Sequence, residues 1–378
     1  MTKTMAVLKI PLILSFLFLY MTTSAQQYYL IIGTYSNTGS KGIYVYSFNA
    51  KSGKVKWVSN TDSSTNPSFV IISHNQKYLY AVNETHGSDP GRVSAYSFDK
   101  KNGKLHFINT TLSGGDAPCH LATSKDDKWL TVANYSSGTT TVFPLNDDGS
   151  LRPYSQLIDD SIYRAAGDNA TPHVHETVFS PDEKYLFTPD LGLDKLMIYE
   201  FHPQSEQPLV LSSPPYVESP KGSGPRHITF HPNKKFAYLM HEMGGIVTAY
   251  HYNDGKFRQI QELPTFPPEF VGKKDGAEIQ VSPDGKFLYV SNRGDLNSIT
   301  IFSIDPTDGK LTLKGYQSTL GKGPRNFIID PAGNFLLVAH QYTNDVIIFK
   351  RNKTSGLLTQ TQNEIHLPIP ICLQLIAK

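Results

Sequence analysis

A block of about fifty residues recurs along this chain, and the recurrence restricts the possible fold more than any other feature. Six segments share one pattern of apolar and turn residues, and they occupy 66–84, 117–135, 174–191, 224–242, 276–293 and 323–341. We number each segment from its anchor, the position held by proline in SPD sequences, which is His74, Lys125, Pro181, Pro232, Pro283 and Pro331. The anchors follow one another at intervals of 48 to 56 residues, and such regular spacing indicates a repeat architecture.

Each repeat reads as four strands. In the fifth repeat, AEIQVS (277–282) and FLYVSN (287–292) flank the turn SPDGK, and SITIFSID (298–305) and KLTLKGYQ (310–317) follow. Aromatic and β-branched residues between Asp-Gly or Asn-Gly turns are typical of β-hairpins. No stretch after residue 25 has a sustained helical period, so we predict an all-β fold with four antiparallel strands per repeat.

The third strand of the repeat occurs seven times, because a further copy precedes the six segments at 42–49. The sequence YYLIIGTY (28–35) before it aligns with the second strands, but no first strand precedes that sequence. The C-terminal PICLQLIA (370–377) aligns with PRHITF (225–230) and supplies the missing strand. We therefore predict a seven-bladed β-propeller over residues 26–378, closed by N- and C-terminal strands in one blade, an arrangement that leaves no exposed sheet edge.

Residues 1–25 differ from the rest of the chain. Lys3 and Lys9 precede an apolar run over 10–20, and Thr23-Ser24-Ala25 offers a small-residue cleavage site. This pattern predicts a secretory signal peptide at 1–25 and export to the periplasm or the medium, because the run is short for a membrane span. The alternative is an uncleaved membrane anchor.

Charge and cysteine content narrow the possible partners. Without Lys3 and Lys9 the chain has 33 basic and 33 acidic residues, which gives no support for binding to nucleic acid or to an anionic membrane. Cys119 and Cys372 lie in first strands of blades that are not neighbours, so we expect two buried thiols rather than a disulfide.

Four positions of the repeat are polar and differ from blade to blade. The −6 column, six residues before the anchor, holds Ser68, Cys119, His175, Arg226, Ala277 and Arg325. The −5 column holds Phe69, His120, Glu176, His227, Glu278 and Asn326. The +9 column holds Asn83, Asn134, Asp190, His241, Asn292 and His340. The +10 column holds Glu84, Tyr135, Leu191, Glu242, Arg293 and Gln341.

These columns meet at one mouth of the ring, where first strands begin and second strands end. A purely structural requirement would favour the same residue in every blade, and charges near an axis are costly unless they are paired or solvated. The columns therefore predict an asymmetric ligand site. The alternative is a wet channel mouth that tolerates polar residues.

The ordered motifs HVHE (173–176), GPRH (224–227), HE (241–242) and SNRG (291–294) resemble the seven-bladed propeller lactonase family, which includes 6-phosphogluconolactonase and is related to carboxy-muconate cyclases. The resemblance covers essentially the whole chain after residue 25. It implies a catalytic group of one histidine, two arginines and one glutamate.

By this resemblance the catalytic residues are His175, Arg226, Glu242 and Arg293, with His173 as the alternative histidine; we prefer His175 because it shares a column with Arg226. The residues that we expect to bind substrate are His120, His173, His227, Glu278, Asn292 and Arg325. Glu242 or His175 would take a proton from water, and the arginines would stabilise the oxyanion.

We expect no cofactor and no metal. In a strand, His173 and His175 would face the same side and could hold zinc, but no third ligand lies nearby in the sequence. Cys119 and His120, as neighbours in a strand, would face opposite sides and so not act as a pair. We expect longer loops at 155–171 and 264–268 that shape specificity.

The leading hypothesis is an exported, monomeric lactonase that hydrolyses a sugar lactone, either 6-phosphogluconolactone or gluconolactone. A phosphogluconate-pathway enzyme would be cytoplasmic, so the export signal puts the phosphorylated substrate in question. The alternatives are a muconate-type lactonising cycloisomerase and a non-catalytic exported propeller that binds a glycan or a protein.

Overall fold

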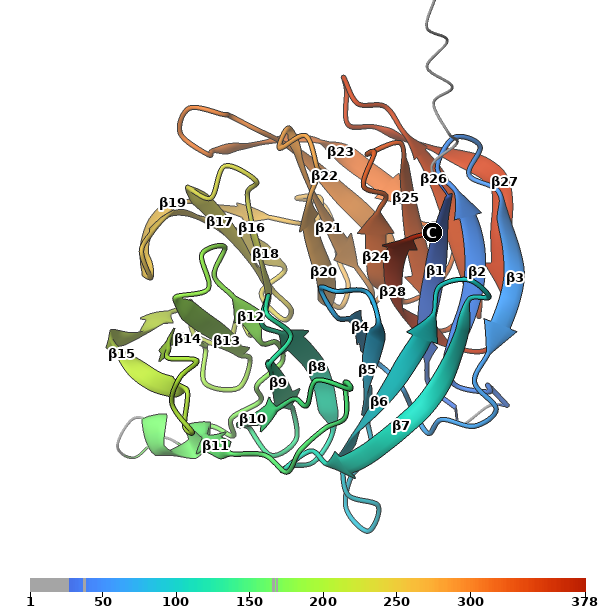
Figure 1. Cartoon of the computed structure of the whole chain (residues 1–378). Coiled ribbons are helices and arrows are strands. Elements are labelled where there is room, and N and C mark those ends of the chain that lie inside the picture. Colours follow the sequence, from blue (N-terminus) through green and yellow to red (C-terminus); the bar gives the residue numbers. More distant parts are fainter. Residues whose placement is uncertain (1–26, 37–38, 165–166, 168) are drawn as a thin grey trace, which may run out of the picture.

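The computed structural model describes residues 27–36, 39–164, 167 and 169–378, so the predicted signal peptide lies outside the described residues. The strands form seven four-stranded antiparallel sheets in a ring (Figure 1). The prediction of an all-β, seven-bladed propeller is confirmed. No helix within the described ranges is long and apolar enough to cross a membrane.

We number the blades from the N-terminus and give their strands from the axis outward. Blade 1 contains β28 (Pro370–Ala377), β1 (Gln27–Thr34), β2 (Tyr44–Asn49) and β3 (Val55–Asn60). Blade 2 contains β4 (Val70–Ile72), β5 (Tyr78–Asn83), β6 (Arg92–Asp99) and β7 (Lys104–Leu112). Blade 3 contains β8 (Pro118–Thr123), β9 (Trp129–Asn134), β10 (Thr139–Pro144) and β11 (Gln156–Asp159). Blade 4 contains β12 (Val178–Phe179), β13 (Tyr185–Asp190), β14 (Lys195–Phe201) and β15 (Leu209–Glu218).

The remaining three blades follow the same order. Blade 5 contains β16 (Pro225–Phe230), β17 (Phe236–His241), β18 (Ile246–Asn253) and β19 (Lys256–Pro264). Blade 6 contains β20 (Gly276–Val281), β21 (Phe287–Asn292), β22 (Ser298–Ile304) and β23 (Leu311–Ser318). Blade 7 contains β24 (Pro324–Ile329), β25 (Phe335–His340), β26 (Asp345–Arg351) and β27 (Leu358–His366).

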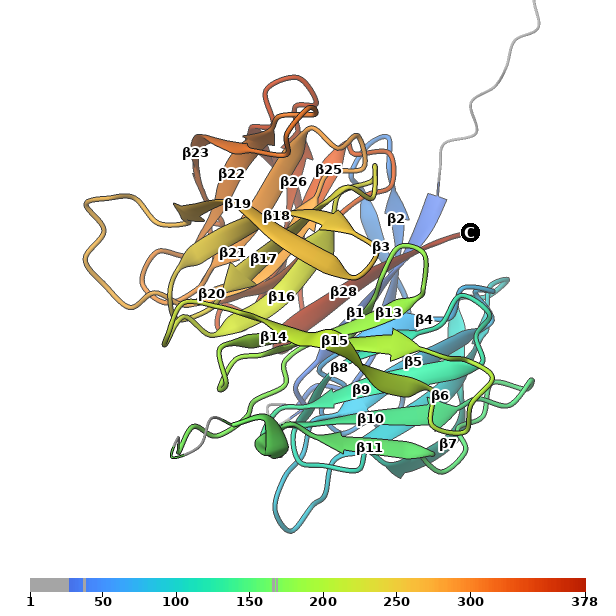
Figure 2. The same cartoon turned by 90° about the vertical axis from the view of Figure 1, so that its left-hand side faces the viewer.

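The two ends of the chain close the ring within blade 1, as predicted. Strand β1 pairs with β2 on one side and with β28 on the other, in a register that sets Tyr28 opposite Ala377 and Ile32 opposite Leu373. Figure 1 shows the dark red β28 beside the blue β1, and Figure 2 shows the same pair from the side. Closure therefore rests on backbone hydrogen bonds between segments more than three hundred residues apart.

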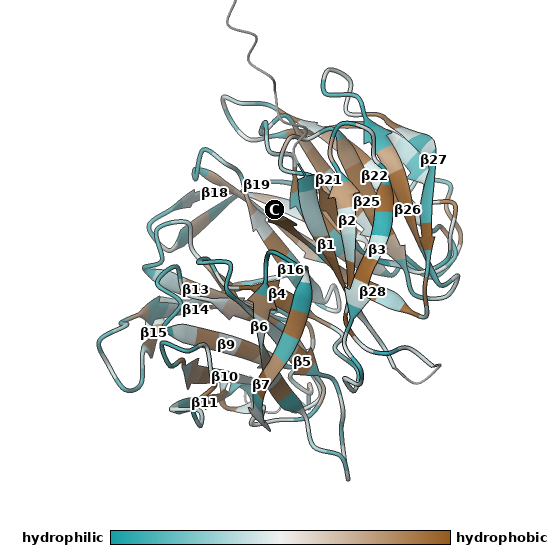
Figure 3. Ribbon diagram, turned by 45° about the vertical axis from the view of Figure 1, so that its right-hand side comes forward, coloured by the Kyte–Doolittle hydropathy of each residue, from teal (hydrophilic) through white to brown (hydrophobic). Residues whose placement is uncertain are grey.

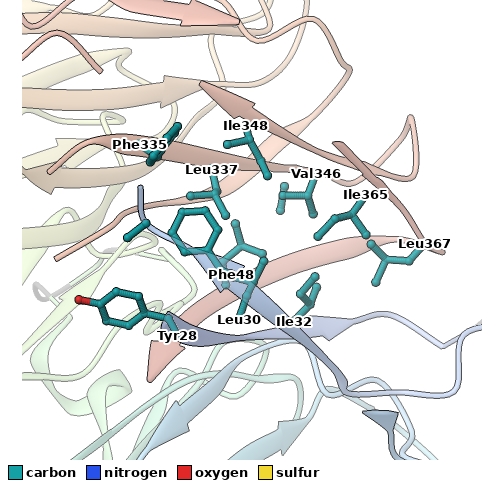
Figure 4. Close-up of a cluster of buried hydrophobic side chains, with 13 residues drawn as sticks. Tyr28, Leu30, Ile32, Phe48, Phe335, Leu337, Val346, Ile348, Ile365 and Leu367 are labelled. Carbon is teal, nitrogen blue, oxygen red and sulfur yellow. The ribbon is translucent and has the colours of Figure 1, made fainter. Parts of the chain in front are cut away.

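Apolar side chains fill the spaces between neighbouring blades. Between blades 1 and 7, Leu30 and Phe48 face Leu337 and Ile348 (Figure 4), and the ring of Phe48 meets that of Phe335 edge to face at 5.9 Å. Hydrophobic colour concentrates on the strands, whereas the connecting loops are mostly hydrophilic (Figure 3). These contacts hold the inner strands at fixed positions around the axis.

One turn position has the same conformation in all six hairpins that follow an inner strand. The residue two after each anchor is left-handed, with φ between +54° and +70°, and these residues are Gln76, Asp127, Glu183, Lys234, Gly285 and Gly333. Glycine takes up this conformation without steric cost, yet four of the six are other residues. A shared structural requirement therefore does not impose one residue type in this chain.

The predicted loop over 155–171 is wrong in its first part, because it contains β11 and the 3₁₀ helix η1 (Asp160–Tyr163). The four residues of β11 pair with β10 and alternate between half-buried and exposed. So short a strand, among polar residues, gives too weak an alternation to be recognised in the sequence.

Helix η1 brings Asp160 against Asp190 in the interior of blades 3 and 4. Both residues are fully buried, and Asp190 Oδ1 accepts hydrogen bonds from the backbone N–H groups of His173, Gly192 and Leu193. Burial, and then the neighbouring Asp190, raises the pKa of Asp160 well above its usual value. Burial raises the pKa of Asp190 too, but its backbone hydrogen bonds and the hydrogen bond with Asp160 oppose that rise, so Asp160 is the member of the pair that holds a proton.

Replacing Asp160 with asparagine should therefore stabilise the fold increasingly as the pH rises. Unfolded Asp160 ionises at its ordinary pKa while the folded carboxyl stays protonated, so the folded state loses stability as the pH rises between those two values. Calorimetry at pH 5 and pH 8 should show the Tm difference between Asp160→Asn and wild type growing by about 2 °C or more. A difference that is constant with pH would contradict this assignment.

Candidate functional site

A β-bulge recurs where the inner strand begins. In β8, β16, β20 and β24 the register with the second strand shifts at the −6 or −5 position. A bulge inserts an extra residue and re-aims the neighbouring side chains. Cys119 and His120 lie at one of these bulges: Cys119 lines the cavity at the axis, and the His120 ring lies 5.4 Å from the His227 ring that lines the same cavity.

The axial cavity is small and tight, and residues from six blades line it. They are Ser68, Phe69, Cys119, His175, Arg226, His227, Arg325, Asn326 and Ile371. Ile371 takes the −6 place in blade 1 because β28 is the inner strand there. The ring has thus brought together side chains that are up to about three hundred positions apart in sequence.

The +9 column is structural. Asn292 is fully buried, and its amide binds Ser298 and Thr300 of blade 6 and Thr265, which directly follows the outer strand of blade 5. The other members of the column are likewise hydrogen bonded around their own blades, and they are Asn83, Asn134, Asp190, His241 and His340. The structure does not place Asn292 with the cavity residues, so we leave it out of the proposed site.

The −5 column joins successive blades around the axis. A −5 side chain accepts a hydrogen bond from the backbone N–H of the −4 residue in the next blade. The acceptor and donor pairs are Cys372 with Val70 (3.4 Å), His120 with Thr177 (3.4 Å), Glu176 with Ile228 (2.7 Å) and Asn326 with Leu373 (2.9 Å). Different residue types meet this one need because each carries an acceptor.

Two carboxyl–imidazole contacts lie in the same layer. His120 Nε2 is 3.8 Å from Glu176 Oε1, and His227 Nδ1 is 3.6 Å from Glu278 Oε2. Burial raises the pKa of Glu278 to about 7 and that of Glu176 well above its usual value, while it lowers the pKa of both histidines. Both histidines are therefore neutral at neutral pH, whereas Glu278 is partly ionised there. His227 and Asn326 connect this layer to the cavity, which they also line.

Glu242 holds two arginines together at the cavity. Its Oε2 lies 2.8 Å from Arg226 Nε and 2.9 Å from Arg293 Nη2, and Arg293 also contacts Asp275 at 2.6 Å. Arg226 is further fixed by the carbonyl of Ala277, to which its Nη1 donates. Burial alone would raise the pKa of Glu242, but Arg293 and Arg226 outweigh it and lower that pKa below its usual value. The carboxylate is thus anionic and bound to two cations.

His175 is the imidazole that faces this charged group. Burial lowers its pKa well below the usual value, and Arg226 and His227 lower it further. Its Nδ1 is buried without a hydrogen-bond partner among the described residues. The ring lies edge-on to those of His227 at 5.2 Å and Tyr135 at 5.5 Å. His175 is therefore neutral, with a nitrogen that no described protein group uses.

His173 lies apart from the cavity. The segment before β12 is irregular, with a single bridge between Val174 and Asp190, so the expectation of a regular strand through HVH is wrong. His173 stacks on Tyr135 at 4.5 Å and its Nδ1 is 3.0 Å from the Tyr135 carbonyl. Across the described ranges no three His, Cys, Asp or Glu side chains are grouped to hold a metal ion.

Three residues complete the group: Arg325, Glu84 of the +10 column, and Tyr35, which the repeat alignment did not select. The Arg325 guanidinium lies 5.9 Å from the centre of the Tyr35 ring, and the Tyr35 hydroxyl donates to Glu84 Oε1 at 2.8 Å. Tyr35 holds the +10 place of blade 1, but the columns were counted from anchors, and that blade has none. The alignment of YYLIIGTY with the other second strands would have identified Tyr35 as the +10 residue of blade 1.

The site is thus built mainly from the −6 and +10 columns, and Phe69, His227 and Asn326 of the −5 column also line the cavity. Comparison with known proteins agrees with this architecture: residues 29–375 match the model of the family "Lactonase, 7-bladed beta-propeller". The chain therefore belongs to the seven-bladed β-propeller lactonase family.

Particular relatives cover nearly the whole chain. A 6-phosphogluconolactonase of Bacillus subtilis is 34% identical over 350 residues, which are 91% of this chain and 97% of that protein. A 6-phosphogluconolactonase of Formosa agariphila is 36% identical over 328 residues, or 86% and 92% of the two chains. Among solved structures, a periplasmic gluconolactonase of Pseudomonas aeruginosa superposes with a TM-score of 0.87 at 36% identity, covering 93% of this chain and 99% of its own.

The structural role of the −5 column can be tested at Glu176. Glu176→Leu leaves the buried N–H of Ile228 without an acceptor, and we expect the free energy of unfolding to fall by about 1–3 kcal/mol. Glu176→Gln keeps an acceptor and should stay within about 1 kcal/mol of wild type. Denaturant titration of both variants measures the difference, and equal losses would contradict the role.

Proposed function

We propose that this protein is a hydrolase that opens a sugar lactone of the gluconolactone type to its aldonic acid. The observation that carries the proposal is the neutral His175, with an unpartnered ring nitrogen, beside two arginines that one carboxylate holds in place. Family membership and the names of the relatives support the same reaction class. A lactone carbonyl needs these two elements, a proton acceptor for water and cations for the developing oxyanion.

We assign the general base to His175 rather than to Glu242. The Glu242 Oε2 already contacts two guanidinium groups, so its lone pairs are engaged, whereas His175 Nδ1 has no partner among the described residues. The lowered pKa of His175 keeps its ring unprotonated, and also makes the imidazolium, once formed, a ready acid. Glu242 is then a positioning residue that holds Arg226 and Arg293.

The reaction proceeds in two steps. His175 takes a proton from water as the water oxygen bonds to the lactone carbonyl carbon, and the carbonyl π electrons move to its oxygen. Arg226 and Arg293 stabilise that oxyanion by charge-assisted hydrogen bonds. The oxyanion then collapses, the ring C–O bond breaks, and the imidazolium of His175 returns the proton to the leaving alkoxide.

Removing the base or an oxyanion donor should lower turnover far more than stability. We expect His175→Gln to reduce kcat by about 10²–10⁴ and Arg226→Lys by about 10²–10³. His173→Gln, which alters the histidine outside the cavity, is the matched control and should stay within about threefold of wild type. The assay is gluconolactone hydrolysis, corrected for the spontaneous reaction. Wild-type turnover by His175→Gln would disprove the assignment.

The pH dependence follows from the lowered pKa of His175. The reaction needs the unprotonated imidazole, so kcat/KM should stay constant as the pH falls through 6.5 and decline only at lower pH. A pH–rate profile with an acidic limb at or above 6.5 would contradict His175 as the base.

We further propose that the protein is exported and acts as a monomer without a cofactor or metal. The signal-like sequence at 1–25 supports export, as does the periplasmic location named for the relative from Pseudomonas aeruginosa. N-terminal sequencing of the protein from the periplasm or the medium should begin at Gln26. A full-length chain retained in the cytoplasm would contradict export, and activity lost on exhaustive chelation would contradict the absence of a metal.

A further inference from the structure

The three arginines at the cavity differ in how far their charges are already paired. Arg226 lies 2.8 Å and Arg293 lies 2.9 Å from the same Glu242 oxygen, and Arg293 also contacts Asp275. Arg325 lines the same cavity as Arg226, but within the described ranges its guanidinium forms no ion pair with a carboxylate and donates no hydrogen bond. Arg325 is therefore the cation of the cavity that has no anionic partner.

An aromatic ring supports the Arg325 side chain. The guanidinium carbon lies 5.9 Å from the centre of the Tyr35 ring, and the Tyr35 hydroxyl donates to Glu84 Oε1 at 2.8 Å. Glu84 thus fixes the ring, while its carboxylate stays beyond ion-pair distance of Arg325. A guanidinium beside an aromatic ring keeps its charge and its N–H donors, because the ring accepts none of these hydrogens in an ordinary hydrogen bond. The donors of Arg325 are therefore available to whatever occupies the cavity.

Opening a lactone creates the anion that Arg325 lacks. Water adds to the carbonyl carbon, the ring C–O bond breaks, and the proton of the new carboxyl group passes to water, so a neutral lactone and water become a carboxylate and one proton. A negative charge is absent from the substrate, present in the tetrahedral intermediate and retained by the product. An interaction that gains strength as this charge forms lowers the barrier without tightening the binding of the neutral substrate.

The paired arginines are less suited to this task. The carboxylate of Glu242 that holds Arg226 and Arg293 also repels a second anion beside it, so the forming oxyanion gains less net attraction from these two cations. Arg325 has no such carboxylate at ion-pair distance among the described residues. Its positive charge is therefore the one that the reaction can use most fully.

From these contacts we infer that Arg325 is a further catalytic residue, which binds the negative charge that forms as the lactone opens and then the carboxylate of the product. Arg226 and Arg293, held by Glu242, fix the place of the carbonyl oxygen, and Arg325 supplies the uncompensated positive charge. This role differs from the one expected from the sequence, in which Arg325 binds the neutral substrate. The inference rests on the proposed lactonase function and adds a third arginine to its mechanism.

The test compares a neutral and an anionic ligand of the same site in variants of Arg325. We expect Arg325→Gln to lower kcat for gluconolactone about tenfold to a hundredfold and to leave KM within about threefold of wild type. The same variant should raise the inhibition constant of gluconate, the anionic product, about tenfold or more. A merely structural role would not separate the two ligands in this way.

Two further variants complete the design. Arg325→Lys keeps the charge but not the planar fork, so it should retain more of kcat and of gluconate inhibition than Arg325→Gln, and it serves if the glutamine variant does not fold. Arg258→Gln removes an exposed arginine from the outer strand β19 and should change neither constant.

The outcomes separate this inference from the proposed function. A raised KM with unchanged kcat in Arg325→Gln, an unchanged inhibition constant for gluconate, or a wild type that gluconate does not inhibit would overturn the role of Arg325 and leave the lactonase intact. Failure of the wild type to hydrolyse gluconolactone would overturn the proposed function, and this inference with it.

Discussion

The antiparallel pairing of β28 with β1 is the interaction on which the rest of this structure depends. It fixes the inner strand of blade 1 and thereby completes the wall of the axial cavity with Ile371. It also leaves no sheet edge at the junction of the two chain ends. The N–H of Leu373 in β28 also donates a hydrogen bond to the side chain of Asn326 in blade 7. The −5 side chains that join successive blades therefore take part in the closure as well.

A second constraint is the charge arrangement that closure makes possible. Glu242 directly follows β17 and Arg293 directly follows β21, and Glu242 contacts both Arg293 and the Arg226 side chain from the start of β16. Two buried guanidinium groups at this distance would repel each other without the shared carboxylate, and a buried charge that loses its partner is strongly destabilising. Glu242 therefore serves the fold as well as the proposed chemistry. His175 stays neutral first because it is buried, and the charge of Arg226 lowers its pKa further.

Comparison of the repeats predicted most of the residues of the candidate site, but not all of its choices were right. It selected His175, Arg226, Glu242, Arg293 and Arg325, all of which the structure gathers around one cavity or its charged wall. It also selected Asn292, whose amide is used in hydrogen bonds to Thr265 and to Thr300 that fix the structure of blade 6 and the segment before it. A structural need was expected to select one residue type in every blade. In fact Glu176, Asn326 and Cys372 all serve as acceptors for a backbone N–H, because the need is for a lone pair rather than for a particular side chain.

The sequence alone determined the number of blades, the four-stranded repeat and the joining of the two termini, because these follow from periodic patterns of apolar and turn residues that one chain displays directly. Only the tertiary structure decided which polar side chains face the axis. The bulge at the start of the inner strands breaks the alternation of faces on which sequence reasoning relies. Likewise, the place of Tyr35 beside Glu84 and Arg325 depends on three blades meeting at one point, which no local pattern encodes.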